Sequence, residues 1–132
     1  MDRIVVDTNV FISSFFGGKP KKIIDMWIDG QFTLCLSASI IEEYVLVLDR
    51  FLGKYDNEID ELLKIFSSGY NSIFVKNPKK LNIVKDDPDD NKFIECAVSL
   101  KAKYLISGDV HLKSIKSYLD IKILSPAEFL DI

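Results

Sequence analysis

Short apolar runs alternate along the chain with stretches in which apolar residues recur every three or four positions. Such runs are typical of buried strands, and such stretches are typical of amphipathic helices. Strands are predicted over 4–6, 32–36, 72–75, 104–107 and 121–124. Helices are predicted over 23–28, 38–52, 56–66, 89–102 and 110–119, with a last helical turn starting at Pro126. This alternation predicts a Rossmann-like, three-layer α/β/α fold with a mainly parallel central sheet.

The composition is that of an ordinary globular chain, with 48% apolar and 28% charged residues. No repeat, low-complexity tract or linker divides the 132 residues, so a single domain over 1–132 is predicted. Cys35 and Cys96 lie in apolar surroundings and are expected to be buried free thiols. No apolar stretch is long enough for a secretory signal or a membrane span, and a cytoplasmic protein is therefore expected.

Two predicted strands end in an aspartate. Asp7 terminates the first strand, and Asp109 follows the strand over 104–107 after one glycine. Sheets of this class bind ligands beyond the carboxyl ends of their strands, where both carboxylates would lie. Each aspartate is also a good N-cap for the segment that follows, and for Asp7 alone capping is the slightly better interpretation. Two strands that both end in Asp favour a site more than either does alone.

Asp90 carries more information than the other acids. Residues 90, 93, 94 and 97 share one helical stripe, and the last three are Phe, Ile and Ala. Asp90 therefore heads the apolar face and is expected to point toward the sheet, whereas Asp89 lies on its flank. In the helix over 38–52, either Glu42 or Glu43 could reach inward, and helical geometry does not choose between them.

Several carboxylates can share one place at neutral pH only if some are protonated or a cation binds them. A ligand set of carboxylate oxygens without a partnering cysteine or histidine suits Mg²⁺ or Mn²⁺ better than zinc or copper. His111, the chain's one histidine, is expected to be incidental.

Charge is unevenly distributed in this acidic chain, whose net charge is −3. The segment 76–85 holds four lysines and no acid, and four acids follow within 86–90. A basic strip beside an acidic metal pocket would suit a phosphodiester substrate. An ordinary solvated loop explains the same pattern equally well.

Four segments, in order, resemble the motifs of PIN-domain nucleases. The first is a strand ending in Asp-Thr-Asn, and the second is a glutamate that precedes an apolar helix. The third is Asp-Pro-Asp-Asp-Asn-Lys-Phe-Ile-Glu-Cys-Ala, and the fourth is Tyr-Leu-Ile-Ser-Gly-Asp. Each motif is weak alone, but the four together span nearly the whole chain. The motifs lie at 5–11, 43–48, 87–97 and 104–109.

The resemblance is closest to the toxin components of toxin–antitoxin systems, which are relatives of VapC-type toxins. It implies a PIN-like fold and a Mg²⁺- or Mn²⁺-dependent endoribonuclease that leaves 5′-phosphate and 3′-hydroxyl ends. It also implies an antitoxin partner and a homodimer. The catalytic and metal-binding acids that it implies are Asp7, Glu43, Asp90 and Asp109. It further implies that Asn9 and Ser107 support the acids or contact the phosphate of the RNA.

Two other interpretations remain open. A phosphatase or receiver-like domain also places Asp at strand ends, but such phosphatases carry a second Asp two residues later, where this chain has Asn9. A catalytically silent module that binds RNA or a protein partner would keep the same acids for another purpose.

Overall fold

The computed structural model describes residues 1–52 and 57–132. In chain order, its strands and helices are β1 (Arg3–Val6), α1 (Thr8–Ser13), the 3₁₀ turn η1 (Ser14–Phe16), α2 (Gly18–Ile28), β2 (Thr33–Ser37), α3 (Ala38–Leu52), α4 (Asn57–Ser68), β3 (Ser72–Val75), the 3₁₀ turn η2 (Pro88–Asp90), α5 (Asn91–Ser99), β4 (Tyr104–Ile106), α6 (Val110–Lys113), β5 (Ser117–Tyr118), β6 (Ile121–Leu124) and α7 (Pro126–Leu130).

Within the described residues, six strands form one sheet in the order β3-β2-β1-β4-β6-β5. All neighbouring pairs are parallel except β5 and β6. The chain builds outward from β1 to β2 and β3, and it then returns to place β4 on the other side of β1. The strand order therefore reverses between β1 and β4, which is where sheets of this class bind ligands.

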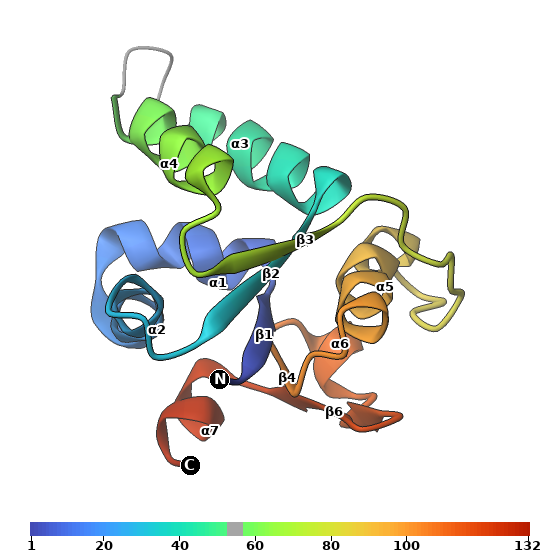
Figure 1. Ribbon diagram of the computed structural model, residues 1–132. Coiled ribbons are helices and arrows are strands. Elements are labelled where there is room, and N and C mark those ends of the chain that lie inside the picture. Colours follow the sequence, from blue (N-terminus) through green and yellow to red (C-terminus); the bar gives the residue numbers. More distant parts are fainter. Residues whose placement is uncertain (53–56) are drawn as a thin grey trace.

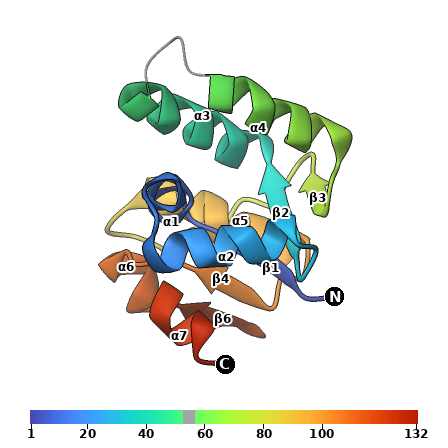
Figure 2. The same ribbon diagram turned by 90° about the vertical axis from the view of Figure 1, so that its left-hand side faces the viewer.

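Helices cover both faces of the sheet (Figure 1). The α1, α2 and α7 helices lie on one face, and α5 and α6 lie on the other. The α3 and α4 helices lie together across the end of the molecule where β3 forms the edge of the sheet, as Figure 2 also shows. This arrangement confirms the predicted three layers and the mainly parallel sheet.

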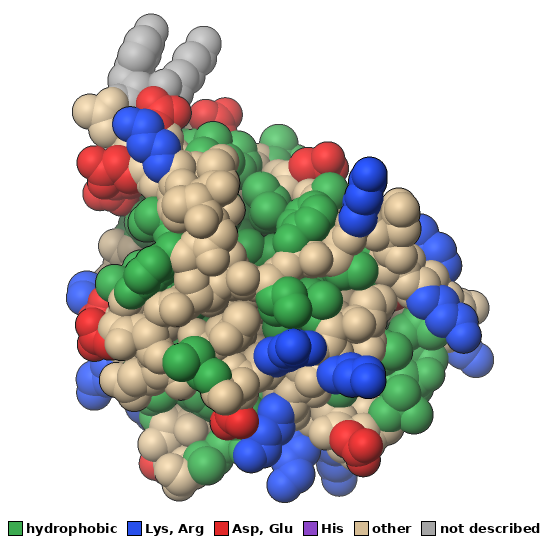
Figure 3. Space-filling view, in the orientation of Figure 1, with side chains coloured by type: hydrophobic (Ala, Val, Ile, Leu, Met, Phe, Trp, Pro, Cys, Tyr) green, Lys and Arg blue, Asp and Glu red, His purple; other side chains and the backbone are tan. Residues whose placement is uncertain are grey.

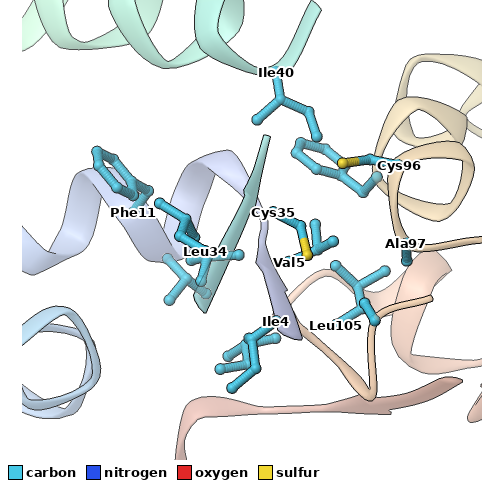
Figure 4. Packing of buried hydrophobic residues seen from close by; sticks show 14 of the residues in the cluster. Ile4, Val5, Phe11, Leu34, Cys35, Ile40, Cys96, Ala97 and Leu105 are labelled. Atoms are coloured by element: carbon cyan, nitrogen blue, oxygen red, sulfur yellow. The ribbon is translucent and has the colours of Figure 1, made fainter. Parts of the chain in front are cut away.

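The core forms where β1, β2 and β4 meet the helices (Figure 4). Ile4, Val5, Leu34 and Leu105 are 1% exposed or less, as expected for central strands with both faces covered. Beside them, the rings of Phe11 and Tyr44 stack with centroids 4.2 Å apart. The buried Tyr44 hydroxyl donates a hydrogen bond to the carbonyl of Val6, the last residue of β1. The contact between α1 and α3 is thereby tied to the strand end that precedes Asp7.

The structure changes several predicted boundaries. The helix predicted over 23–28 begins earlier, at Gly18, and the one predicted over 89–102 consists of η2 followed by α5. The prediction of a helix over 110–119 is wrong after Lys113. Lys116 has a φ of 65°, which ends helical geometry, and the chain then pairs with β6 as β5. Asp56, the predicted start of α4, lies outside the described residues.

Candidate functional site

Asp7 and Ser107 form the centre of the arrangement at the carboxyl ends of β1 and β4. The Asp7 side chain is 3% exposed and accepts a hydrogen bond from the Val10 amide at 2.9 Å, which caps α1. Its second oxygen accepts a hydrogen bond from the Ser107 hydroxyl. Asp7 therefore caps α1 and belongs to the site at the same time. Its Oδ1 caps the helix, and its Oδ2 faces Ser107.

Asp109 is held in a similar way at the start of α6. Its Oδ1 accepts hydrogen bonds from the amides of His111 at 2.8 Å and Leu112 at 3.3 Å. The Ser107 hydroxyl oxygen in turn accepts the Asp109 amide at 2.9 Å. Ser107 thus connects the two aspartates that follow neighbouring strands.

Asp90 is the last residue of η2, the turn before α5, and Asp87 immediately precedes that turn. The Asp90 amide donates to the Asp87 carbonyl at 3.0 Å, which folds the two side chains toward the same place. Asp87, Asp90 and Asp109 each offer a carboxylate oxygen, and these oxygens lie within 4.8 Å of one another. The Oδ2 atom of Asp90 is buried and has no hydrogen-bond partner among the described residues.

Glu43 reaches the same place from α3. Its Oε2 accepts a hydrogen bond from the Thr8 hydroxyl, and its Oε1 lies 3.0 Å from the Lys92 Nζ. The Glu43 and Lys92 side chains are 27% and 20% exposed, so this ion pair is partly withdrawn from water. Glu42 is exposed and lines a groove between α3 and α4 instead. The structure thereby places Glu43, and not Glu42, beside the aspartates.

These side chains enclose a cavity of about 170 Å³, which we call the acidic pocket. It is lined by Asp7, Thr8, Asn9, Glu43, Val47, Asp87, Asp90, Phe93 and Asp109.

The surroundings of the acidic pocket disfavour the ionised form of two of its carboxyl groups. Burial, followed by the nearby charges of Asp109 and Asp87, raises the pKa of Asp90 to about 7. Burial also raises the pKa of Asp7 to about 6, although the hydrogen bonds from Ser107 and Val10 act in the opposite direction. Both shifts report carboxylates that lack a sufficient positive partner, and perturbed groups of this kind often mark functional sites.

The pocket fits a hard divalent cation on chemical grounds. Its donors are carboxylate oxygens, which Mg²⁺ and Mn²⁺ prefer. A buried carboxylate oxygen without a partner is costly, and a cation would supply the missing interaction for Asp90 Oδ2. Asp87, Asp90 and Asp109 are the residues best placed to hold such an ion, with Asp7 and Glu43 lining the same pocket.

The sequence-based site residues fall into two groups in the structure. Asp7, Asn9, Glu43, Asp90 and Asp109 line the acidic pocket, whereas Ser107 lies fully buried behind it and contacts Asp7. His111 lies outside the lining, 4.0 Å from Asp86.

Three residues of this arrangement were not among the predicted site residues: Asp87, Thr8 and Lys92. For Asp87, the available signal was its place three residues before Asp90 in a proline-containing turn. Thr8 follows Asp7 directly, and Lys92 precedes Phe93 on a flank of the helix. Their partnership with Glu43 depends on how α1 and α5 pack against α3, which sequence spacing does not reveal.

Two other expectations bear on the chain as a whole. Cys35 and Cys96 are buried free thiols, as predicted, and burial raises the pKa of Cys35 to about 12. None of the helices within 1–52 and 57–132 has the length and apolarity needed to cross a membrane.

Comparison with known proteins gives consistent results. Uncharacterized protein MJ1680 of Methanocaldococcus jannaschii is 35% identical over 144 residues, which cover 98% of this chain and 90% of the relative. A chain in the structure of FitAB bound to an IR36 DNA fragment superposes with a TM-score of 0.57. That match has 16% identity and covers 93% of this chain and 94% of the other, so it supports the fold alone. The family model described as PIN domain matches residues 3–111, and the chain therefore belongs to the PIN domain family.

Proposed function

We propose that this protein is a Mg²⁺- or Mn²⁺-dependent endoribonuclease. PIN domains are generally metal-dependent nucleases. The observation that carries the proposal is the convergence of Asp7, Glu43, Asp90 and Asp109 on one pocket, where an oxygen of Asp90 is buried without a partner among the described residues.

In this proposal, Asp90 and Asp109 are the principal metal ligands, Asp87 joins them, and Asp7 completes the set. A divalent cation held by these residues would stabilise negative charge on the phosphoryl group and would activate a water molecule for attack. In this scheme Ser107 keeps Asp7 oriented, and the exposed side chain of Asn9, which lines the pocket, would donate a hydrogen bond to a phosphate oxygen.

Glu43 has a separate task in this scheme. Its carboxylate is held by Thr8 and Lys92, so it is less available than Asp90 as a ligand. We assign it to orienting the attacking water from the α3 side of the pocket. The Lys92 ammonium beside it would then lie close to the negative charge that develops on the phosphate.

RNA as the substrate, an antitoxin as the partner, a homodimer and the toxin role all derive from the resemblance of the four motifs to VapC-type toxins. They form part of the proposal and are tested separately from the chemistry.

One observation favours a second candidate, a catalytically silent module that binds RNA or a protein. Lys92 already neutralises Glu43 at 3.0 Å, and Asp7 and Asp109 each use one oxygen for helix capping. In a pocket that only binds a partner and does not catalyse, the carboxylates would be stabilised by such ion pairs and hydrogen bonds. Asp90 is the exception, because its buried oxygen has no such donor among the described residues.

Incubation with a mixed RNA pool in Mn²⁺ or in EDTA separates the two candidates, with the cut ends read by sequencing. We expect cleavage only with Mn²⁺, leaving 5′-phosphate ends. Asp90→Asn should reduce the rate by roughly 100-fold or more, the usual cost of losing one group that stabilises transition-state charge.

The chain offers two matched controls for this assay. Asp89→Asn changes the exposed neighbour of Asp90, and Glu42→Gln changes the exposed neighbour of Glu43. Both controls should cleave as the wild type does, whereas Glu43→Gln should be impaired. RNA binding without metal-dependent cleavage, or wild-type rates in Asp90→Asn, would replace the nuclease with the silent module.

A further inference from the structure

The loop between β3 and η2 carries a concentration of positive charge in an acidic protein. Residues 76–85, which we call the basic strap, contain four lysines and no acid, in a chain whose net charge is −3. All four lysine residues are exposed. They are Lys76, Lys79, Lys80 and Lys85.

The basic strap is fixed in place by α5. The Leu81 amide donates to the Glu95 carboxylate at 2.9 Å. The amides of Ile83 and Val84 both donate to Asn91 Oδ1, at 2.9 and 2.8 Å. Asn91 and Glu95 are 7% and 6% exposed, so these hydrogen bonds are shielded from water. A freely solvated loop would not be attached to buried polar groups, and the strap therefore presents its lysines from a defined surface.

The strap leads into the acidic pocket. It runs antiparallel to α5, from the Lys79 amide near Ser99 Oγ to Val84 at Asn91. The chain then passes through Asp87 into η2, which ends at Asp90. The stretch of α5 between Asn91 and Ser99 is about 12 Å long at 1.5 Å per residue. That is roughly the length of three to four stacked nucleotides at about 3.4 Å each.

Within 1–52 and 57–132, the strap lysines form few ion pairs, although four acids follow them in the sequence. Among the described residues, the strap lysines make one ion pair, between Lys80 Nζ and Glu95 Oε1 at 4.0 Å. The Lys80 side chain is 87% exposed, so this contact is weak. On the face shown in Figure 3, Lys and Arg side chains lie along the right-hand side, where Figure 1 places α5 and this loop, and along the bottom, near β4 and β6. Acidic side chains gather more over α3 and α4.

We propose that the basic strap holds the phosphate backbone of a single-stranded RNA that enters the acidic pocket. The inference rests on the proposed nuclease function and assigns the surface that grips its substrate. A pocket of carboxylates repels a polyanion, so a nuclease of net charge −3 needs local positive charge beside the pocket. An acidic segment of a protein partner is the competing occupant, and the test below separates the two.

The test measures binding of a short labelled single-stranded RNA in EDTA, by fluorescence anisotropy, between about 50 and 200 mM salt. Lys79→Gln/Lys80→Gln removes two charges from the middle of the strap. It removes the weak 4.0 Å contact of Lys80 with Glu95 but leaves the pocket and the backbone hydrogen bonds to α5 in place. We expect several-fold weaker binding at the lowest salt. The plot of log affinity against log salt should become shallower by about 1.4, at about 0.7 for each of two lost phosphate contacts.

Lys22→Gln/Lys64→Gln is the matched control, because it removes two exposed lysines from α2 and α4 and gives the same net charge. Its salt dependence should stay at the wild-type value. An unchanged slope in the strap variant, or equal changes in both variants, would overturn the proposal. A poly-glutamate peptide that binds more tightly than RNA, and loses that binding in the strap variant, would assign the strap to an acidic partner instead.

Binding in EDTA tests the strap assignment, and cleavage in Mn²⁺ tests the nuclease proposal, so the two proposals can fail separately. Strap-dependent RNA binding by a wild-type protein that never cuts RNA would keep the strap assignment and remove the nuclease. Cleavage by a protein whose RNA binding ignores the strap lysines would keep the nuclease and remove the strap assignment.

Discussion

Asp90 is partly buried, with its Oδ2 atom withdrawn from water, yet neutral pH favours ionisation of this carboxyl group in the unfolded chain. Its pKa rises from an ordinary 3.8 to about 7 in the folded protein, chiefly through burial. Between these values the folded protein holds more protons than the unfolded chain. The free energy of unfolding without metal therefore falls as the pH rises from about 4 to about 7.

We therefore predict that Asp90→Asn stabilises the metal-free protein. At pH 8 in EDTA the free energy of unfolding should rise by about 1–2 kcal/mol, a value reduced from the full shift because the site is partly solvated. The difference in free energy of unfolding between the variant and the wild type should shrink at pH 5, where wild-type Asp90 is protonated. Urea unfolding at the two pH values measures it. The residual pH dependence of the variant should follow Asp7, whose pKa is raised to about 6.

Asp89→Asn tests whether the effect belongs to this position. Asp89 is exposed one residue away, and its replacement should leave the pH dependence of unfolding as in the wild type. A variant of Asp90 that is less stable than the wild type at pH 8 would show that its charge is already compensated.

The residues of the pocket differ in how far the sequence reveals them. Strand ends locate Asp7 and Asp109, and helical phase directs Asp90 inward. Helical phase places Lys92 off the apolar stripe and hence in solvent, yet its ammonium reaches across to Glu43. That contact exists because α5 packs beside α3, and no local pattern encodes the packing of two helices about 50 residues apart.

At the level of elements, the sequence predicts the central strands well because they are apolar on both faces. The predicted helix is wrong after α6, because the local spacing there favours a helix where the chain forms a strand. Leu112, Ile115 and Leu119 are spaced as in a helix, but Lys116 and Leu119 adopt φ values of 65° and 53°. The hairpin of β5 and β6 depends on pairing with the edge of the sheet, and the helical spacing in this segment conceals it.

Asn91 joins α5 to the strap through three hydrogen bonds and to η2 through a fourth. Its Oδ1 accepts two amides, and its Nδ2 donates to the carbonyls of Val84 at 3.3 Å and Pro88 at 3.0 Å. Asn91→Ala should lower the free energy of unfolding by about 2–3 kcal/mol, because buried amides lose their acceptor. Amide hydrogen exchange at Ile83 and Val84 should accelerate in the same variant.

Asn82→Ala provides the comparison, because Asn82 is an exposed residue of the same loop. It should change neither stability nor exchange by a measurable amount. Slow exchange at Val84 in the Asn91 variant would mean that the strap holds its position by other contacts.

At the scale of the whole molecule, the fold brings acidic side chains from several elements together beyond the carboxyl ends of β1 and β4. The reversal of strand order between β1 and β4 places the capping aspartates Asp7 and Asp109 side by side. The α3 helix adds Glu43, and the turn before α5 adds Asp87 and Asp90. The resulting excess of negative charge lies inside a folded protein, so its relief by a cation should appear as stability of the entire fold. Binding to the folded state alone stabilises by about 2.7 kcal/mol when the free ligand is 100-fold above its Kd.

We expect Mn²⁺ at such a concentration to raise the Tm by about 10 °C at pH 8, given the usual unfolding entropy for chains near this size. The increase should shrink at pH 5, because protons on Asp90 and Asp7 then compete with the cation. Differential scanning calorimetry of the wild type, Asp90→Asn and Asp89→Asn measures it, and only Asp90→Asn should lose the response. An equal Tm increase in all three proteins, or a larger one at pH 5, would place the cation elsewhere, because in the acidic pocket protons and metal compete for the same oxygens.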